Sequence, residues 1–182
     1  MKKIAVLFSG SGTNFKYILE NLHKSKLEVV LALTNNPNAG GILYAKEYKI
    51  PLIIRATKSY ISRKIFDKTI VDDIKNSGAE LVVLAGFMRI LTPTFTSNVN
   101  AINLHPSLLP RHKGLNAIEN SYNDSHKEGG VTVHHVTSEL DGGEIIVQKS
   151  INKGSLDFNE YNQLIRKIEK EALAEAILKV LN

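Results

Sequence analysis

Residues 81–91 have the sequence LVVLAGFMRIL, and residues 101–110 have the sequence AINLHPSLLP. The first stretch begins with four consecutive apolar residues and continues into a glycine-containing loop, which predicts a strand buried on both faces. The second predicts a short apolar strand whose hydrogen-bond ladder ends at Pro106. Asn103 and His105 are two residues apart, so in an extended chain their side chains point to the same face. An amide beside an imidazole can polarise a carbonyl group and transfer a proton.

Strands and helices alternate on both sides of these two stretches. Apolar runs predict strands at residues 4–8, 28–33, 51–54, 81–84, 101–105, 131–136 and 144–148. Helical periodicity predicts helices at residues 15–22, 39–48, 62–77, 117–122 and 157–181, with a further start at Thr92-Pro93, where Thr92 is the expected N-cap. The alternation predicts an α/β fold with a doubly wound, mostly parallel sheet, helices on both faces, and one domain over residues 1–182.

Two of the predicted helices have marked apolar sides. The helix at 62–77 is expected to bury Ile65, Phe66, Ile70 and Ile74. The last helix is expected to bury a stripe formed by Leu164, Ile165, Ile168, Leu173, Ile177, Leu178 and Leu181.

Composition limits the classes of function. A hydrophobic content of 43% and a charged content of 23% are typical of a soluble globular protein. No cysteine is present, which excludes disulfides, a thiolate nucleophile and a cysteine zinc site. No apolar run has membrane-spanning length and no signal peptide precedes the first strand, so we expect a cytoplasmic protein.

The net charge of +5 favours small anionic ligands over nucleic acid. The basic residues are scattered, without a long run and without the interleaved aromatic residues that stack on bases. A mildly basic surface is the simplest interpretation. Binding of anionic substrates by a few of these residues is the alternative.

A glycine-rich loop, SGSGTN at residues 9–14, lies between the first strand and the first helix. Free backbone N–H groups and the helix dipole both favour an anion there, which predicts a monophosphate site. A Walker motif and a nucleophile elbow do not fit the sequence, and no acid ends the next strand as NAD binding would require. A tight turn that only needs glycines is the alternative. Arg63, in the first turn of a later helix, suits a phosphate held by this loop.

The segments at 9–14, 85–89 and 103–105 each lie at the carboxyl end of a predicted strand. Ligands of open α/β sheets bind beyond the carboxyl ends of the strands, so we expect these segments along one edge. The phosphate loop, an apolar wall at 87–91 and the Asn103–His105 pair would then form one site.

Two further polar segments have competing interpretations. His134 and His135 are adjacent in a strand and face opposite sides, which favours structural roles. Asp141, followed by two glycines, is either a turn residue or an acid beside His105. In the second case it would orient the imidazole and favour its protonated form.

Over nearly its whole length the chain resembles the phosphoribosylglycinamide formyltransferase family. The resemblance rests on four motifs, SGSGTN at 9–14, AGFMRIL at 85–91, NLHPSLLP at 103–110 and ELDGG at 139–143. It implies transfer of a formyl group from 10-formyltetrahydrofolate to the amine of glycinamide ribonucleotide in purine biosynthesis. It implies no metal, nucleic acid or membrane partner, and it leaves open whether the chain forms a homodimer.

The resemblance also implies roles for individual residues. Asn103 would bind the formyl oxygen, His105 would act on the oxyanion and the proton, and Asp141 would be the partner of His105 and a proton relay through water. The acceptor site would consist of Ser11, Gly12, Thr13, Asn14, Arg63, Gly86, Pro106 and Glu169. The folate site would consist of Met88, Arg89, Ile90, Leu91, Asn103, Leu140 and Asp141.

Some features depart from the family, and other activities remain alternatives. Residues 111–114 read RHKG in place of the usual turn, and Asn116 stands where many members have a histidine. A formyltetrahydrofolate hydrolase is expected to need an added amino-terminal domain, and a methionyl-tRNA formyltransferase an added carboxy-terminal one. A non-catalytic nucleotide-binding module would leave Asn103, His105 and Asp141 unexplained.

Overall fold

A computed structural model describes all residues, 1–182. The strands are β1 (Lys3–Phe8), β2 (Glu28–Thr34), β3 (Leu52–Ile54), β4 (Leu81–Leu84), β5 (Ala101–His105), β6 (Glu128–His135) and β7 (Ile145–Asn152). The α-helices are α1 (Thr13–Asn21), α2 (Gly41–Glu47), α3 (Arg63–Ser77), α4 (Pro93–Thr96), α5 (Ala117–Asn123) and α6 (Phe158–Leu181), with a 3₁₀ turn at Thr57–Ser59. No helix is both long enough and apolar enough to cross a membrane.

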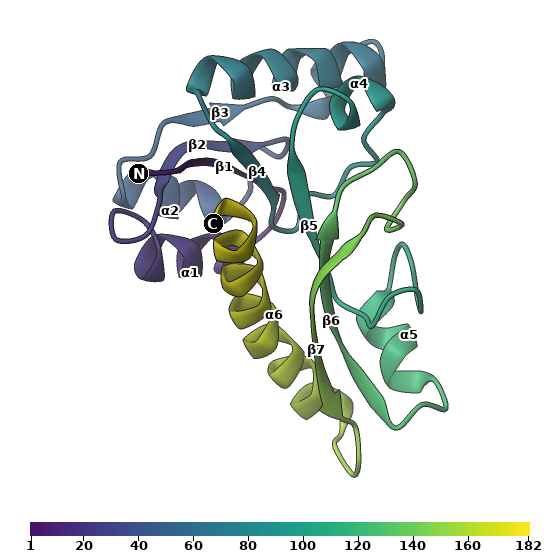
Figure 1. Cartoon of the computed structure of the whole chain (residues 1–182). Coiled ribbons are helices and arrows are strands. Elements are labelled where there is room, and N and C mark those ends of the chain that lie inside the picture. Colours follow the sequence, from purple (N-terminus) through teal and green to yellow (C-terminus); the bar gives the residue numbers. More distant parts are fainter. The chain divides into compact units, whose positions relative to one another are not determined.

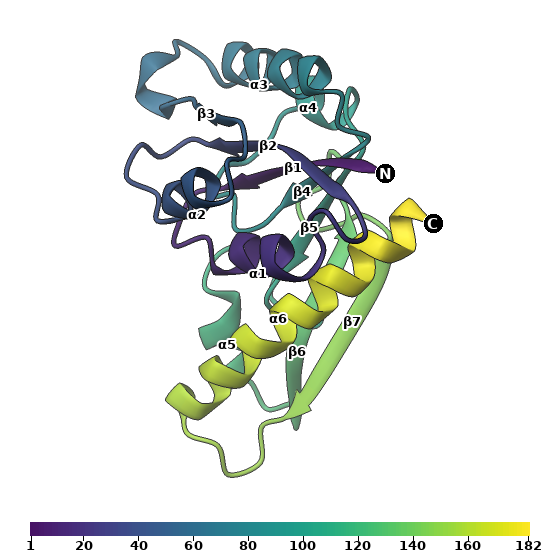
Figure 2. The same cartoon turned by 90° about the vertical axis from the view of Figure 1, so that its left-hand side faces the viewer.

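The chain divides into two compact units, and the first comprises Met1–Asn103 together with Leu181. Its sheet has the order β3-β2-β1-β4-β5, and every neighbouring pair is parallel. Helix α3 covers one face of this sheet and helices α1 and α2 cover the other (Figures 1 and 2). Because both faces are covered, β1 and β4 are continuous apolar runs, and residues 4–8 and 81–84 are all buried.

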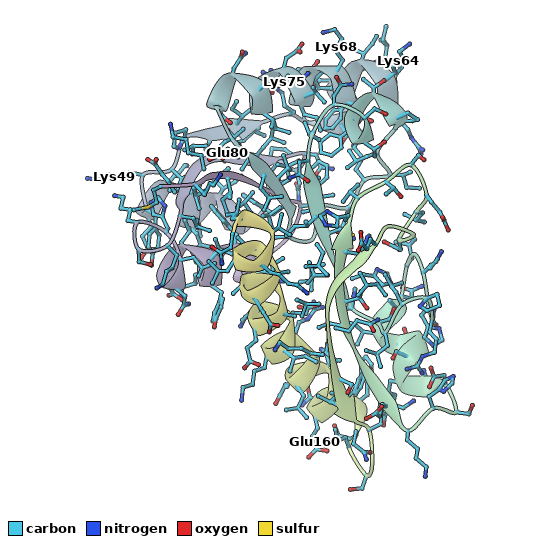
Figure 3. All side chains as sticks on the ribbon, in the orientation of Figure 1. Lys49, Lys64, Lys68, Lys75, Glu80 and Glu160 are labelled. Atoms are coloured by element: carbon cyan, nitrogen blue, oxygen red, sulfur yellow. The ribbon has the colours of Figure 1, made fainter.

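Helix α3 begins as the sequence predicts but buries a different set of residues. The Ser62 hydroxyl accepts a hydrogen bond from the Ile65 N–H, as an N-cap does. Ile65 itself is 45% exposed, so its expected place on the buried side is wrong. The buried side contains Phe66, Asp67, Ile70, Val71 and Ile74. On the outer side Lys64, Lys68 and Lys75 point away from the sheet, in agreement with a scattered basic surface (Figure 3).

Thr92 shows a second departure from the expected local chemistry. Its side chain makes no cap hydrogen bond to the one-turn helix α4. The Thr92 hydroxyl and backbone N–H both donate to Oδ2 of the buried Asp67, each at 2.6 Å. Thr92 therefore joins the chain after β4 to α3, and a long-range carboxylate replaces the predicted local cap.

The second unit comprises Leu104–Val180 together with Asn182. Strands β6 and β7 pair antiparallel, and α6 runs along this hairpin, where Lys149 of β7 bonds Glu175 of α6 at 2.7 Å (Figure 1). Asp157 and Glu160 form a capping box that starts α6. The predicted stripe is only partly buried, because Ile165, Leu173 and Ile177 are buried whereas Leu164 is 38% exposed.

The predicted fold class is confirmed, because the seven strands form a mostly parallel sheet in an α/β fold that agrees with solved relatives. Strands β4 and β5 have the predicted bounds, and the remaining elements shift by a few residues at their ends. The single domain over residues 1–182 stays a prediction.

Candidate active site

In the first unit, two predicted site loops lie against each other. The loop after β1 and the loop after β4 follow neighbouring parallel strands. The Ser9 N–H donates to the Gly86 carbonyl at 3.0 Å, and the Met88 N–H donates to the Ser9 hydroxyl at 2.8 Å. Asn103 lies at the same edge, since it pairs in register with Leu84 of β4. The expectation that strand ends gather these segments is met within this unit.

Gly12 shapes the start of α1, where the sequence predicts a phosphate site. Its φ of 76° lies in the left-handed region, and a Cβ at this position would overlap the Cα of Gly41, so the position requires glycine. The first turn of α1 contains no acidic residue, and no side chain caps it. The backbone N–H groups of this turn, with the helix dipole, remain suited to a phosphate.

Ser9, Asn35 and Asn36 form a network that the sequence interpretation missed. The Ser9 hydroxyl contacts Oδ1 of Asn35 at 2.5 Å, and Nδ2 of Asn36 donates to the Ser9 carbonyl at 2.9 Å. Asn35 and Asn36 follow the end of β2, so their place beside Ser9 comes from the parallel pairing of β1 and β2. The network holds the glycine-rich loop against the sheet edge.

The predicted apolar wall divides into exposed and buried side chains. Met88 is 72% exposed and Ile90 is 56% exposed. The Arg89 guanidinium instead lies 3.9 Å from the ring centroid of Phe66, and its Nε lies 3.7 Å from Oδ1 of Asp67. Arg89 therefore stabilises the loop from inside the first unit.

Arg63 is exposed in the first turn of α3. Helices α1 and α3 lie on opposite faces of the sheet of the first unit (Figure 2). The interaction of Arg63 with the phosphate loop stays a prediction, and its test is given below.

In the second unit, His105 and Asp141 lie together and both are buried. Nδ1 of His105 is 3.4 Å from Oδ2 of Asp141. Nε2 of His105 is 2.8 Å from the backbone carbonyl of His112. A carbonyl can only accept, so Nε2 bears the hydrogen and Nδ1 faces the carboxylate. The two ring nitrogens of His105 therefore have separate partners, a backbone carbonyl and a carboxylate.

Asp141 occupies a left-handed turn and has several polar neighbours. Its φ is 50°, and its Oδ2 accepts a hydrogen bond from the Gly114 N–H at 2.8 Å. Burial alone would raise the pKa of the Asp141 carboxyl, but hydrogen bonds from His134 and Gly114 and the charge of His105 outweigh it, so this pKa is lowered. Asp141 is therefore ionised near neutral pH. Asp141 is therefore both a turn residue and the acid beside His105, so the two interpretations from the sequence do not exclude each other.

His134 belongs to this cluster, although its position in a strand favoured a purely structural role. Its Nε2 lies 3.5 Å from Oδ1 of Asp141, and its Nδ1 donates to the His135 carbonyl at 2.9 Å. Asp141 thus lies between two imidazoles. The adjacency of two histidines in β6 gave no sign of this, because the contact depends on the turn that follows.

The other predicted site residues have the following surroundings. Leu140 is exposed beside Asp141, and Pro106 is half-buried after β5. Glu169 is buried on α6 and accepts a hydrogen bond from Arg166 at 3.2 Å. No group of three or more His, Cys, Asp or Glu residues could hold a metal ion.

Comparisons with known proteins agree on one family. A model described as "Formyl transferase" matches residues 2–177. A phosphoribosylglycinamide formyltransferase from Haemophilus influenzae is 39% identical, covering 83% of this chain and 73% of that protein. One from Bacillus subtilis is 34% identical, covering 100% and 95%. The crystal structure of the protein of this name from Campylobacter jejuni has a TM-score of 0.98 at 48% identity, covering 100% of this chain and 98% of that chain. The chain therefore belongs to the formyl transferase family, and within it to the phosphoribosylglycinamide formyltransferases.

Proposed function

We propose that this chain transfers the formyl group of 10-formyltetrahydrofolate to the amine of glycinamide ribonucleotide in the synthesis of purines. The observation that supports this best is the buried His105–Asp141 pair, at 3.4 Å, in a chain of this family. The acceptor supplies a phosphate, which suits the start of α1, and the donor supplies a flat ring, which suits exposed Met88 and Ile90.

The reaction assigns a separate task to each catalytic residue. The amine nitrogen attacks the formyl carbon, and the carbonyl electron pair moves onto the formyl oxygen. Asn103 donates a hydrogen bond to this developing oxyanion, and so does the Nδ1–H of protonated His105, which faces Asp141 at 3.4 Å before the substrates bind. Asp141 accepts, through water, the proton that the amine loses. The bond between the formyl carbon and the folate nitrogen then breaks, and that nitrogen takes up a proton.

Turnover with and without acceptor tests the proposal. The purified chain is mixed with 10-formyltetrahydrofolate, and release of tetrahydrofolate is followed by absorbance. We expect release only when glycinamide ribonucleotide is present. Release without acceptor would identify a hydrolase, and binding without turnover would identify a non-catalytic module.

Arg63→Ala tests the acceptor site. A guanidinium paired with a phosphate forms charge-assisted hydrogen bonds, so its loss should raise KM for glycinamide ribonucleotide about tenfold. KM for the folate should stay within about twofold of the wild-type value, because the lost interaction contributes only to binding of the acceptor. Lys64→Ala, one residue along α3 and exposed, is the matched control. A raised KM for the folate with an unchanged KM for the acceptor would contradict this assignment and would place Arg63 in the donor site instead.

Hydrogen exchange tests the donor site. A folate analogue without a formyl group should bind in the absence of acceptor and protect the backbone amides of residues 87–91 and the loop around Leu140. Apolar contact and backbone hydrogen bonds are the expected interactions with a pterin ring. Protection confined to residues 9–14 would argue against this assignment.

We further propose that the chain works in the cytoplasm, on small-molecule substrates and without a metal. Its active form is either a monomer or a homodimer. Analytical ultracentrifugation at the assay concentration distinguishes the two.

A further inference from the structure

The loop from Arg111 to Gly114 contacts both members of the His105–Asp141 pair. Its His112 carbonyl accepts the hydrogen bond from Nε2 of His105 at 2.8 Å. Its Gly114 N–H donates to Oδ2 of Asp141 at 2.8 Å. The loop lies between β5 and α5 in the second unit (Figure 1). The orientation of the imidazole and of the carboxylate therefore depends on where this loop is held.

The side chain of His112 ties the loop to the body of the second unit. Nε2 of His112 is 2.7 Å from Oδ2 of Asp124, which directly follows α5. The φ of His112 is 56°, in the left-handed region that non-glycine residues seldom adopt. A side-chain contact that compensates this backbone cost is expected at such a position.

The Asp124 carboxylate is fixed in place by hydrogen bonds from two basic side chains besides His112. Nζ of the buried Lys153 donates to Oδ1 of Asp124 at 2.7 Å and also to the Ser121 carbonyl at 2.8 Å. Arg111 donates to Oδ2 of Asp124 at 3.2 Å. Burial would raise the pKa of the Asp124 carboxyl, but the hydrogen bonds from Lys153 and His112 outweigh it, so this pKa is lowered well below its usual range. Asp124 therefore stays charged at neutral pH.

We propose that His112 is a positioning residue for His105. Its imidazole, held by Asp124, fixes the carbonyl that accepts the Nε2 proton, and so keeps Nδ1 of His105 directed at Asp141. This inference rests on the proposed function and deepens it, since it assigns a role in that reaction to the loop at residues 111–114. The contact acts on His105 through the backbone carbonyl of His112, while the His112 imidazole is directed at Asp124.

His112→Ala should lower kcat about tenfold, because a small misplacement of a catalytic group costs much of its effect. KM for both substrates should stay within about twofold. Alanine keeps a Cβ, so the backbone cost of the positive φ is unchanged and only the contact with Asp124 is lost. His112→Gln should restore most of kcat, because its amide can donate to Asp124 from nearly the same place as Nε2. His126→Ala, an exposed imidazole two residues after Asp124, is the matched control.

Proton NMR of histidine-labelled protein detects the hydrogen bond between His105 and the His112 carbonyl independently of turnover. The wild-type protein should show a slowly exchanging Nε2–H signal from His105, assigned by its absence in His105→Ala. This signal should vanish in His112→Ala and return in His112→Gln. An intact signal and wild-type kcat in His112→Ala would overturn the inference. A wild-type protein that shows the signal but no formyl transfer would instead overturn the proposed function.

Discussion

Replacement of Asp141 by asparagine is expected to lower kcat by roughly 10²-fold or more, the range that general acid–base groups contribute. In free energy this is about 2.7 kcal/mol of lost transition-state stabilisation. Asparagine keeps the shape of the side chain and tolerates the left-handed φ of 50°. It can also still accept the hydrogen bond from the Gly114 N–H. The change therefore removes the charge and the proton acceptor while the turn stays in place.

The same sample separates the catalytic role of Asp141 from a structural one. Steady-state kinetics should show the loss in kcat with little change in KM, because the interaction strengthens only in the transition state. A thermal melt should give a midpoint close to that of the wild type. A lowered midpoint with intact kcat would make Asp141 a turn residue only.

His105→Ala is expected to lower kcat by at least a similar factor, about 10²-fold. Asn103→Ala should do the same, because each donor to the oxyanion contributes separately. The double variant His105→Ala/Asp141→Asn should lose far less than the product of the two single losses, since the pair acts as one unit. These variants are compared by kcat at saturating concentrations of both substrates.

Independent losses in the double variant would contradict the pairing of His105 with Asp141. Multiplicative effects are the rule for residues that share no partner. Nδ1 of His105 and Oδ2 of Asp141 are 3.4 Å apart, so we expect the two losses to be coupled and not multiplicative.

The part of the fold that the sequence predicted is the part set by local patterns. The apolar runs at 81–84 and 101–105 became β4 and β5 with the predicted bounds. The helix predicted at 62–77 is present at 63–77, and Ser62 is its N-cap. The adjacency of the loops after β1 and β4 followed from parallel pairing alone.

The features that the sequence did not predict depend on contacts between distant residues. The Thr92 hydroxyl donates to the buried Asp67, 25 residues earlier, and makes no cap hydrogen bond to α4. Ile65 satisfies the helical period but is 45% exposed, because periodicity shows which residues share a side of the helix and not how far that side is covered.

The candidate site shows the same division. Adjacency of His105 and Asp141 was anticipated through the family motifs, and the structure brings them together. His134 and His112 were missed, because each contributes through one ring nitrogen directed at a carboxylate from another element. The ring position that meets Asp124 depends on the positive φ of His112, which no local pattern of histidine predicts.

An isotope-transfer assay follows the formyl group itself from donor to acceptor. The wild-type chain and Asp141→Asn, at equal folded concentrations, are given 10-formyltetrahydrofolate with an isotopically labelled formyl carbon and glycinamide ribonucleotide. Mass spectrometry then follows the label. The wild type should place it on the acceptor amine, and Asp141→Asn should do so about 10²-fold more slowly. Equal rates in both proteins would contradict a catalytic role for Asp141, and label recovered only as formate would contradict formyl transfer to the acceptor.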